Sequence, residues 1–345
     1  PKGLITVLAA LPAKQLKRFK EYLHFQPFNG KPKLVELFLL IESQILKPGK
    51  LHTELESLLP DSSIRPTQLN KLTTLLHQKL DLFLSLQQIE NEPHRHLPFT
   101  LYAYKELGIE PGLSEKKWRQ LHKKLNAGPQ TEEHFIQRYY LAQIATQIRI
   151  GPAPKATESH FQHIHDLSDL AYVTAKMRYL CASLNEAAIL NLPAPTAQIA
   201  AIAPLIDQCK SEFPPYSEAF HLVFQLLSAT APPPADFERV LDFLRLHGSL
   251  IDSEDLFDLY NYALNAIYRR IDLSEPGFTE LAATTYINML DHRLLTLGGT
   301  MHPRIFKNIV TTHCLLQRFE WCNSFIRDYQ RFLKGEDAQL LIRYC

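Results

Sequence analysis

Valine and glycine are scarce in this chain of 345 residues, which holds 6 valines and 12 glycines against 57 leucines. Sheet proteins depend on β-branched residues, whereas helical proteins rely on Leu, Ala, Gln, Glu and Lys. The composition therefore argues against a β-rich fold and predicts an all-α protein. Because 46% of the residues are hydrophobic, it also excludes general disorder.

Cysteine is also rare, and its pattern suggests no special chemistry. The five cysteines are odd in number and include no CxxC pair. All of them fall at positions with helical spacing. We interpret them as buried, reduced thiols and expect a cytoplasmic protein.

One long stretch lacks charge, and it raises the question of a membrane span. Residues 187–206 are twenty uncharged residues, nominally enough to cross a bilayer. Prolines, together with Asn191, Thr196 and Gln198, interrupt this stretch, so we expect two helices joined by a loop. The apolar run at residues 4–11 continues at helical spacing, which favours an amphipathic hairpin over an export signal. We therefore expect no transmembrane segment and no membrane partner.

Catalytic motifs are missing. The sequence contains no P-loop, GxGxxG, GxSxG or paired-carboxylate motif. His313 and Cys314 are adjacent, and adjacent helical residues diverge by about 100°, so these two do not form a nucleophile–base pair. We therefore expect no enzymatic activity and no cofactor.

Histidines gather in the segment ESHFQHIHDLSD. On a helix His160 and His163 share a face, and Asp166 could add a carboxylate for a divalent metal. His165 points away from His163, however, and no HExxH-type pair completes a site. We interpret the cluster as solvated or helix-capping histidines, and a metal-dependent enzyme is the third-ranked function.

Leucine spacing predicts helices along most of the chain. In residues 1–130 they are short and uneven, so this region is predicted to be a helical bundle or cap, with EPHRHLP assigned to a loop. The predicted helices up to the start of the regular part cover about residues 4–11, 13–25, 32–46, 50–59, 66–90, 97–107, 114–126, 131–150 and 158–191.

Charge is unevenly distributed, although the net charge is +1. Residues 1–130 carry 19 Lys/Arg and 12 Asp/Glu, whereas residues 131–345 carry 18 and 24. This asymmetry can steer a partner but falls short of the basic stripe typical of nucleic-acid binding. The alternative function is nevertheless nucleic-acid association through the basic half. Its two basic segments contain Lys14, Lys17, Arg18 and Lys20, and Lys116, Lys117, Arg119, Lys123 and Lys124.

A pattern that recurs every 41 residues begins near residue 158. Stepping back from Phe319 gives Phe278, Phe237 and Thr196, and most positions at helical spacing after each are apolar. A unit of this size is one helix hairpin, which cannot bury its apolar face alone. We therefore expect about four hairpins to stack within residues 131–345. The sequence starts at proline and ends without a polar capping helix, so native residues are expected beyond both ends.

The last unit resembles a tetratricopeptide repeat (TPR), although the earlier units are about seven residues longer than that family's. The run LPAKQLKRFKEYLHFQPFN followed by LVELFLLIE also resembles the opening of uncharacterised bacterial TPR-like proteins. The resemblance implies a right-handed α-solenoid of antiparallel hairpins and transfers no activity. Val310 and Tyr329 depart from the small residues usual at their places, and Lys334 stands where the motif has proline. The signature positions of the repeat fall on Phe306, Ile309, Val310, His313, Phe319, Cys322, Ile326 and Tyr329.

A binding surface follows from this expected array, in which the first helices of successive units line a concave face. In DLFDLYNYALNAIYRRI, the inward-packing apolar residues leave Asn261, Asn265 and Arg269 on a separate stripe. Arg304 and Lys307 take the equivalent lip of the next unit. Amide and guanidinium groups suit an extended peptide backbone or a carboxylate. We therefore predict a non-catalytic scaffold that binds a protein or peptide segment along this face.

Overall fold

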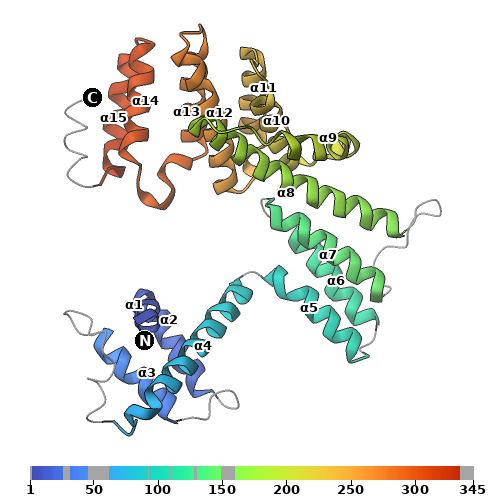
Figure 1. Cartoon of the computed structure of the whole chain (residues 1–345), viewed down its shortest axis with the longest axis vertical. Helices are drawn as coiled ribbons and strands as arrows, with labels where there is room; N and C mark the ends of the chain where they lie inside the picture. The colour runs from blue at the N-terminus through green and yellow to red at the C-terminus, as the bar shows by residue number, and fades with distance from the viewer. Residues whose placement is uncertain are drawn as a thin grey trace. The chain divides into compact units, whose positions relative to one another are not determined.

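The structure is a computed structural model, and it describes residues 2–25, 32–45, 62–91, 93–108, 111–127, 130–148 and 160–334 (Figure 1). Within these ranges every regular element is a helix, and the β-type pairing is limited to an isolated bridge between Gln130 and Ile251. The prediction of an all-α fold is confirmed for the described part of the chain. The helix predicted at 50–59 lies outside the described residues.

Contacts between residues divide the chain into two compact units, Pro1–Leu97 and Pro98–Cys345. The boundary predicted from the sequence is at residue 130. In the structure α6 (Pro111–Leu125) packs on α7 (Glu132–Ile148), which in turn packs on α8 (His160–Leu190). This packing across residue 130 joins α6 to the C-terminal unit.

The first unit is a helical bundle with a leucine-rich core. Phe19 is fully buried, and its ring contacts those of Phe38 and Phe83 with centroid separations of 5.3 and 5.1 Å. Two of the helices begin at a proline, which the first turn tolerates because the N–H there has no helical partner. The helices are α1 (Lys2–Ala10), α2 (Ala13–His24), α3 (Pro32–Ile45) and α4 (Pro66–Asn91).

Because proline suits the first turn of a helix, one prediction is wrong. The EPHRHLP segment was assigned to a loop, but α5 (Pro93–Glu106) begins within it. Pro93 occupies the first helical position, where its fixed φ suits the helix and its missing N–H costs nothing. The assignment was wrong because this proline starts a helix.

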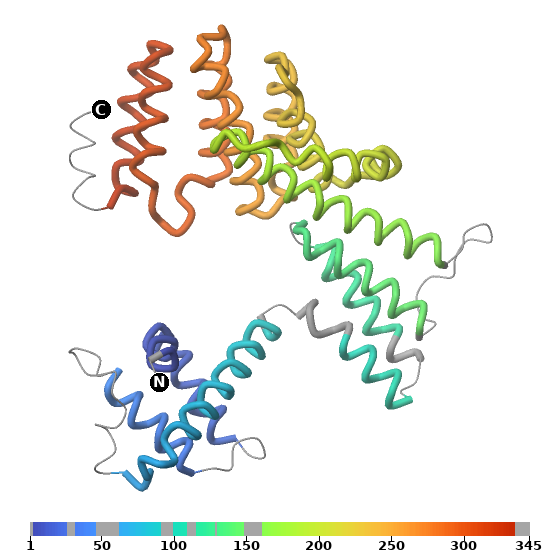
Figure 2. The backbone as a smooth tube through the Cα atoms, viewed as in Figure 1, coloured from blue at the N-terminus to red at the C-terminus, as the bar shows by residue number. Residues whose placement is uncertain are grey.

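Residues 160–334 form four consecutive helix hairpins, which Figure 2 shows as successive pairs along the C-terminal unit. Neighbouring hairpins pack on one another through α8 and α10, α10 and α12, α11 and α13, and α13 and α14. The pairs are α8 with α9 (Thr196–Cys209), α10 (Pro215–Ser228) with α11 (Pro234–His247), α12 (Ser253–Asp272) with α13 (Phe278–Asp291), and α14 (Pro303–Leu315) with α15 (Phe319–Tyr329), which η5 (Gln330–Phe332) follows.

The positions aligned by the 41-residue step all lie at or near the start of the second helix of a hairpin. Thr196, Phe278 and Phe319 begin α9, α13 and α15, and Phe237 is close to the start of α11. Helix starts are unevenly spaced because the connections differ. A short η3 segment (Gly248–Leu250) precedes α12, whereas η4 (Leu294–Gly299) lengthens the connection before α14.

One hydrophobic core runs through the second unit, from Phe135 in α7 to Leu333 after η5. Polar bonds within it tie three helices together. The Tyr268 hydroxyl of α12 is hydrogen-bonded to the hydroxyls of Tyr286 in α13 and Thr312 in α14, at 2.9 and 3.2 Å. Buried hydroxyls need such partners, so these bonds favour one arrangement of the third and fourth hairpins.

Within the part of the chain that the structure describes, no helix combines the length and apolar character needed to cross a bilayer. The uncharged stretch 187–206 is divided between α8 and α9, as predicted. Asn191 ends α8 with a left-handed φ of 54°, a conformation that asparagine tolerates better than most residues.

Candidate functional site

Helix α8 carries a stripe of large side chains that the described part of the chain leaves exposed. Tyr172, Tyr179 and Leu190 are 54%, 57% and 57% exposed. Together with Glu186 they recur at spacings of seven and four residues, which places them on one face of the helix. An exposed face that carries several large side chains beside a carboxylate is typical of an interaction surface.

A pocket of about 440 Å³ opens beside this stripe, between α8 and α12. Figure 1 shows the two helices in the same part of the C-terminal unit, and α8 packs on both α10 and α12. We call this pocket with the stripe the α8–α12 groove. The residues that line the pocket are Tyr179, Ala182, Ser183, Asn185, Glu186, Ile189, Leu190 and Tyr262.

The structure brings part of the predicted patch to this groove. The Asn265 side-chain amide donates a hydrogen bond from Nδ2 to Oδ1 of Asn185, at 3.0 Å, and Asn185 lines the pocket. Asn261 is half-buried one turn earlier on α12, and Arg269 is exposed one turn later. Of the two amides predicted on α12, the structure pairs Asn265 with α8.

The other two predicted residues lie elsewhere. Arg304 and Lys307 are exposed on α14, and neither lines the α8–α12 pocket. The backbone N–H of Arg304 instead donates to Nδ1 of His302, which caps the start of α14 at 3.2 Å.

A partly buried ionic network joins α8 to α7, α10 and α12. Arg178 of α8 donates from Nε to Asp255 of α12 at 2.8 Å, and its Nη1 lies 3.5 Å from Glu132 of α7. The Tyr216 hydroxyl of α10 donates to the other oxygen of Asp255 at 2.6 Å. Asp255 is only 6% exposed, so three helices meet at one buried carboxylate, and Glu132 links α7 to them through Arg178.

This network perturbs the pKa values of its members. Burial alone would lower the pKa of Arg178, but the hydrogen bond and charge of Asp255 raise it above its usual range. Burial and the Asp255 charge raise the pKa of Tyr216, and burial raises that of Glu132. The arginine and tyrosine therefore stay protonated at any physiological pH, and their role is to hold helices in place.

Arg178 of the network also contacts one aromatic wall of the groove. The Arg178 guanidinium lies over the Tyr179 ring, 5.5 Å from its centroid, which is a cation–π contact. On the opposite wall, burial and the nearby Asp258 charge raise the pKa of Tyr262 to about 12, so this phenol is neutral. The Tyr262 ring is therefore an uncharged, amphipathic wall, and the Tyr179 ring faces the guanidinium of Arg178.

Sequence reasoning missed this network. Its signal was a charged residue within an apolar pattern: Arg178 follows the buried Met177, and Asp255 precedes the buried Leu256. The pairing itself joins residues 77 positions apart in the chain. Helical periodicity is a local signal, so it does not show which charges meet.

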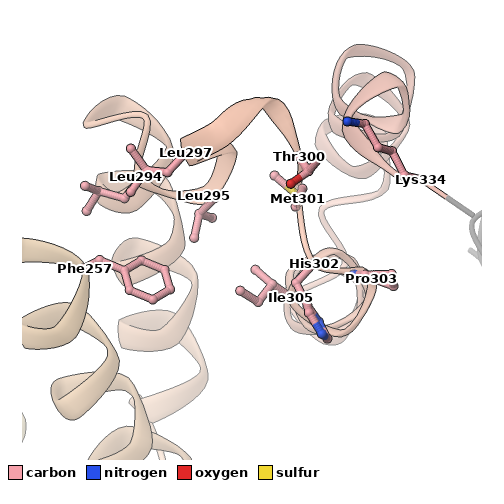
Figure 3. Close-up of a pocket in the computed structure, with 10 residues that line it drawn as sticks. All are labelled: Phe257, Leu294, Leu295, Leu297, Thr300, Met301, His302, Pro303, Ile305 and Lys334. Atoms are coloured by element: carbon pink, nitrogen blue, oxygen red, sulfur yellow. The ribbon is translucent and has the colours of Figure 1, made fainter. Parts of the chain in front are cut away.

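A second pocket, of about 460 Å³, lies between α12, η4 and the start of α14 (Figure 3). Its walls are mainly apolar, and they include Phe257, Leu295 and Ile305. The lining residues that can carry a charge are His302 and Lys334, which Figure 3 places on different sides of the pocket. Ligand sites combine apolar walls with polar groups that converge, and the α8–α12 groove fits that description better.

The remaining histidine candidates do not form a site in the described residues. His160 begins α8, and His163 and His165 are exposed on it, while Gln162 donates to Asp166 at 2.8 Å. Across the described ranges, no group of three His, Cys, Asp or Glu side chains is placed to hold a metal ion.

His313 packs in the core. It is fully buried, its ring stacks on Trp321 with a centroid separation of 3.6 Å, and neither ring nitrogen has a hydrogen-bond partner among the described atoms. Burial lowers its pKa to about 4. The neighbouring Cys314 thiol lies 3.7 Å from that of Cys322. The geometry gives His313 no nucleophile to activate.

Some of the predicted basic residues are neutralised within the chain. Such exposed ion pairs contribute little stability, but they reduce the positive charge available to a nucleic acid. The pairs are Arg18–Glu90, Lys20–Glu42 and Arg119–Glu115, at 2.8, 3.4 and 2.6 Å.

No protein-family model, curated protein or solved structure matches this chain. The likeness to tetratricopeptide repeats therefore stays a prediction from the sequence, and a functional assignment has to rest on the geometry of the α8–α12 groove.

Proposed function

We propose that this protein is a non-catalytic scaffold that binds an extended peptide segment of a protein partner in the α8–α12 groove. In this proposal the four hairpins α8 to α15 stack as a right-handed, TPR-like α-solenoid, and the groove lies on its concave face. The proposal is supported by the uncovered stripe on α8, the adjoining pocket and the paired amides on its wall.

The observation that carries the proposal is the amide pair. The bond from Asn265 Nδ2 to Asn185 Oδ1 uses one donor and one acceptor. An asparagine amide has two N–H donors and an oxygen with two lone pairs. The pair therefore retains a donor on Asn185 and an acceptor on Asn265, which complement the C=O and N–H of a peptide backbone.

The rest of the groove defines the kind of segment that fits. Tyr179 and Tyr262 provide flat walls for apolar side chains, while Ile189 and Leu190 extend the apolar surface along α8. Glu186 is exposed at the rim and can accept from a lysine or arginine. We infer a partner segment with apolar side chains and at least one basic residue.

The proposal can be tested by affinity capture from native lysate with tagged wild-type protein and two variants. Tyr179→Ala with Glu186→Lys alters the groove, and because both side chains are exposed, the fold should survive. Leu246→Ala is the control, since this leucine is 65% exposed on α11 and does not line the pocket. Unchanged melting temperatures would verify folding.

A protein partner retained by wild type and by the control, but lost with the groove variant, would support the proposal. The captured protein should then yield a short segment that binds alone. Equal retention by all three forms would exclude this groove. If nucleic acid is captured instead, and is released steeply with rising salt, the basic first half becomes the functional region.

A further inference from the structure

Three arginines surround a pocket that is distinct from the α8–α12 groove. This pocket has a volume of about 650 Å³ and lies where η4 faces the end of α15. Arg293 precedes η4, and Arg327 and Arg331 come from α15 and η5. We call it the arginine pocket.

The charge of the pocket is opposite to that of its surroundings. Among its lining residues three arginines face one carboxylate, Asp328, whereas residues 131–345 carry more acidic than basic side chains. Asp328 lies 3.6 Å from Arg327 in a solvent-exposed pair, which neutralises little. The lining therefore presents a local excess of guanidinium groups, whose planar donors match phosphate oxygens.

The two sides of the pocket are fixed relative to each other. The backbone N–H of Met301, just after η4, donates to the carbonyl of Phe332 in η5 at 2.9 Å. The Arg331 guanidinium lies over the Phe332 ring, 4.9 Å from its centroid. Binding an anion here therefore requires little ordering of the backbone, which preserves affinity.

Arg293 occupies a position that suits glycine. It follows α13 with φ 58° and ψ 23°, in the left-handed region that is unfavourable for a long side chain. Asn191, Ser274 and Gln317 also have positive φ near helix ends, but none of them lines this pocket. A strained backbone that carries a charged side chain into a pocket points to a function for that charge.

We propose that the arginine pocket binds a small molecule that carries a diphosphate group. The guanidinium excess matches the multiple negative charges of a diphosphate better than the single charge of a carboxylate. The Tyr329 ring and the apolar part of the lining leave room for an organic group attached to it. This proposal is independent of peptide binding in the α8–α12 groove.

Titration calorimetry with inorganic pyrophosphate, at low and moderate salt, tests the proposal directly. ADP forms a second arm, and tighter binding of ADP than of pyrophosphate would show that the organic group contributes. The decisive variant is Arg293→Gly, which removes the charge and relieves the strained backbone. We expect its affinity for pyrophosphate to fall about tenfold or more, without a lower melting temperature.

Two control variants separate binding from stability. Gln317→Gly relieves the same left-handed strain at φ 58° without changing charge, so it should bind pyrophosphate like wild type. Arg245→Gln removes an exposed arginine on α11 and should also bind like wild type. No pyrophosphate binding by wild type would overturn the proposal. Equal pyrophosphate binding by Arg293→Gly and wild type would also overturn the proposal. Arg293 would then be only a cation near the end of a helix.

Discussion

Lowering the pH from about 7.5 to about 5 is expected to cost the folded chain about 2 kcal/mol of stability through one side chain, His313. This ring is fully buried between α14 and α15, stacked on Trp321, with no hydrogen-bond partner for either nitrogen among the described atoms. Burial, followed by the positive charge of Arg318, lowers its pKa from 6.5 to about 4. Protonation of the folded state is therefore unfavourable.

The sign of the effect follows from proton binding. Between pH 6.5 and about 4 the unfolded chain protonates this histidine while the folded chain does not, so stability falls as the pH falls through that window. Below about pH 4 both states bind the proton and the loss levels off. The full loss for a shift of this size is about 3 kcal/mol, of which about 2 kcal/mol is reached by pH 5.

Urea unfolding measures the effect, followed by Trp fluorescence, because Trp321 contacts the histidine. The comparison is between wild type, His313→Phe and a control, His163→Gln, in which an exposed histidine is replaced. Phenylalanine keeps the stacking and removes two unsatisfied polar atoms, so it should not weaken the protein at pH 7.5. Wild type and the control should each lose about 2 kcal/mol more than His313→Phe between pH 7.5 and 5. Equal losses in all three proteins would show that protonation of His313 does not destabilise the fold.

Three further predictions concern other buried groups. Asp255→Ala should cost roughly 3–5 kcal/mol in urea unfolding, because it leaves a partly buried guanidinium and a buried phenol without their shared partner. Tyr268→Phe should cost about 1–2 kcal/mol in the same assay, since two hydroxyl partners lose a bond. Cys181 should resist a thiol reagent in the native state, because burial raises its pKa, whereas the half-buried Cys314 should react sooner than Cys181 when labelling is mapped by mass spectrometry.

Each of these three predictions would be contradicted by a particular outcome. A change below about 1 kcal/mol in Asp255→Ala would show that the network does not hold the four helices together. An unchanged unfolding midpoint in Tyr268→Phe would remove the hydroxyl link between the third and fourth hairpins. Labelling of Cys181 as fast as a free thiol would show that α8 separates readily from α10.

Much of the fold is predictable from local pattern. Leucine spacing located the helices to within a few residues, since each helix must bury one face. The stretch around Asn191 was correctly divided into two helices by its prolines and polar residues. The segment beginning at Pro93 was wrongly assigned to a loop, because proline both starts and stops helices and the sequence alone does not distinguish the two.

The candidate site was less predictable, because it depends on how one unusually long helix packs. A simple array of hairpins lets each first helix contact its immediate neighbours. At 31 residues, α8 reaches both α10 and α12, and it meets Asn265 through Asn185. The spacing of polar residues on α12 identified Asn265 but gave no sign of its partner. The pairing of Arg178 with Asp255 could not be predicted for the same reason, because spacing within one helix does not identify a partner on another.

The most direct test of the account is the binding of defined peptides to the α8–α12 groove. Random peptides displayed on phage would be selected on the wild-type protein, and the best binders would be titrated by fluorescence anisotropy against wild type, Tyr179→Ala and Leu246→Ala. The account predicts peptides with apolar side chains and a basic residue that lose about tenfold or more in affinity with Tyr179→Ala alone. Selected peptides that bind all three proteins equally would contradict it.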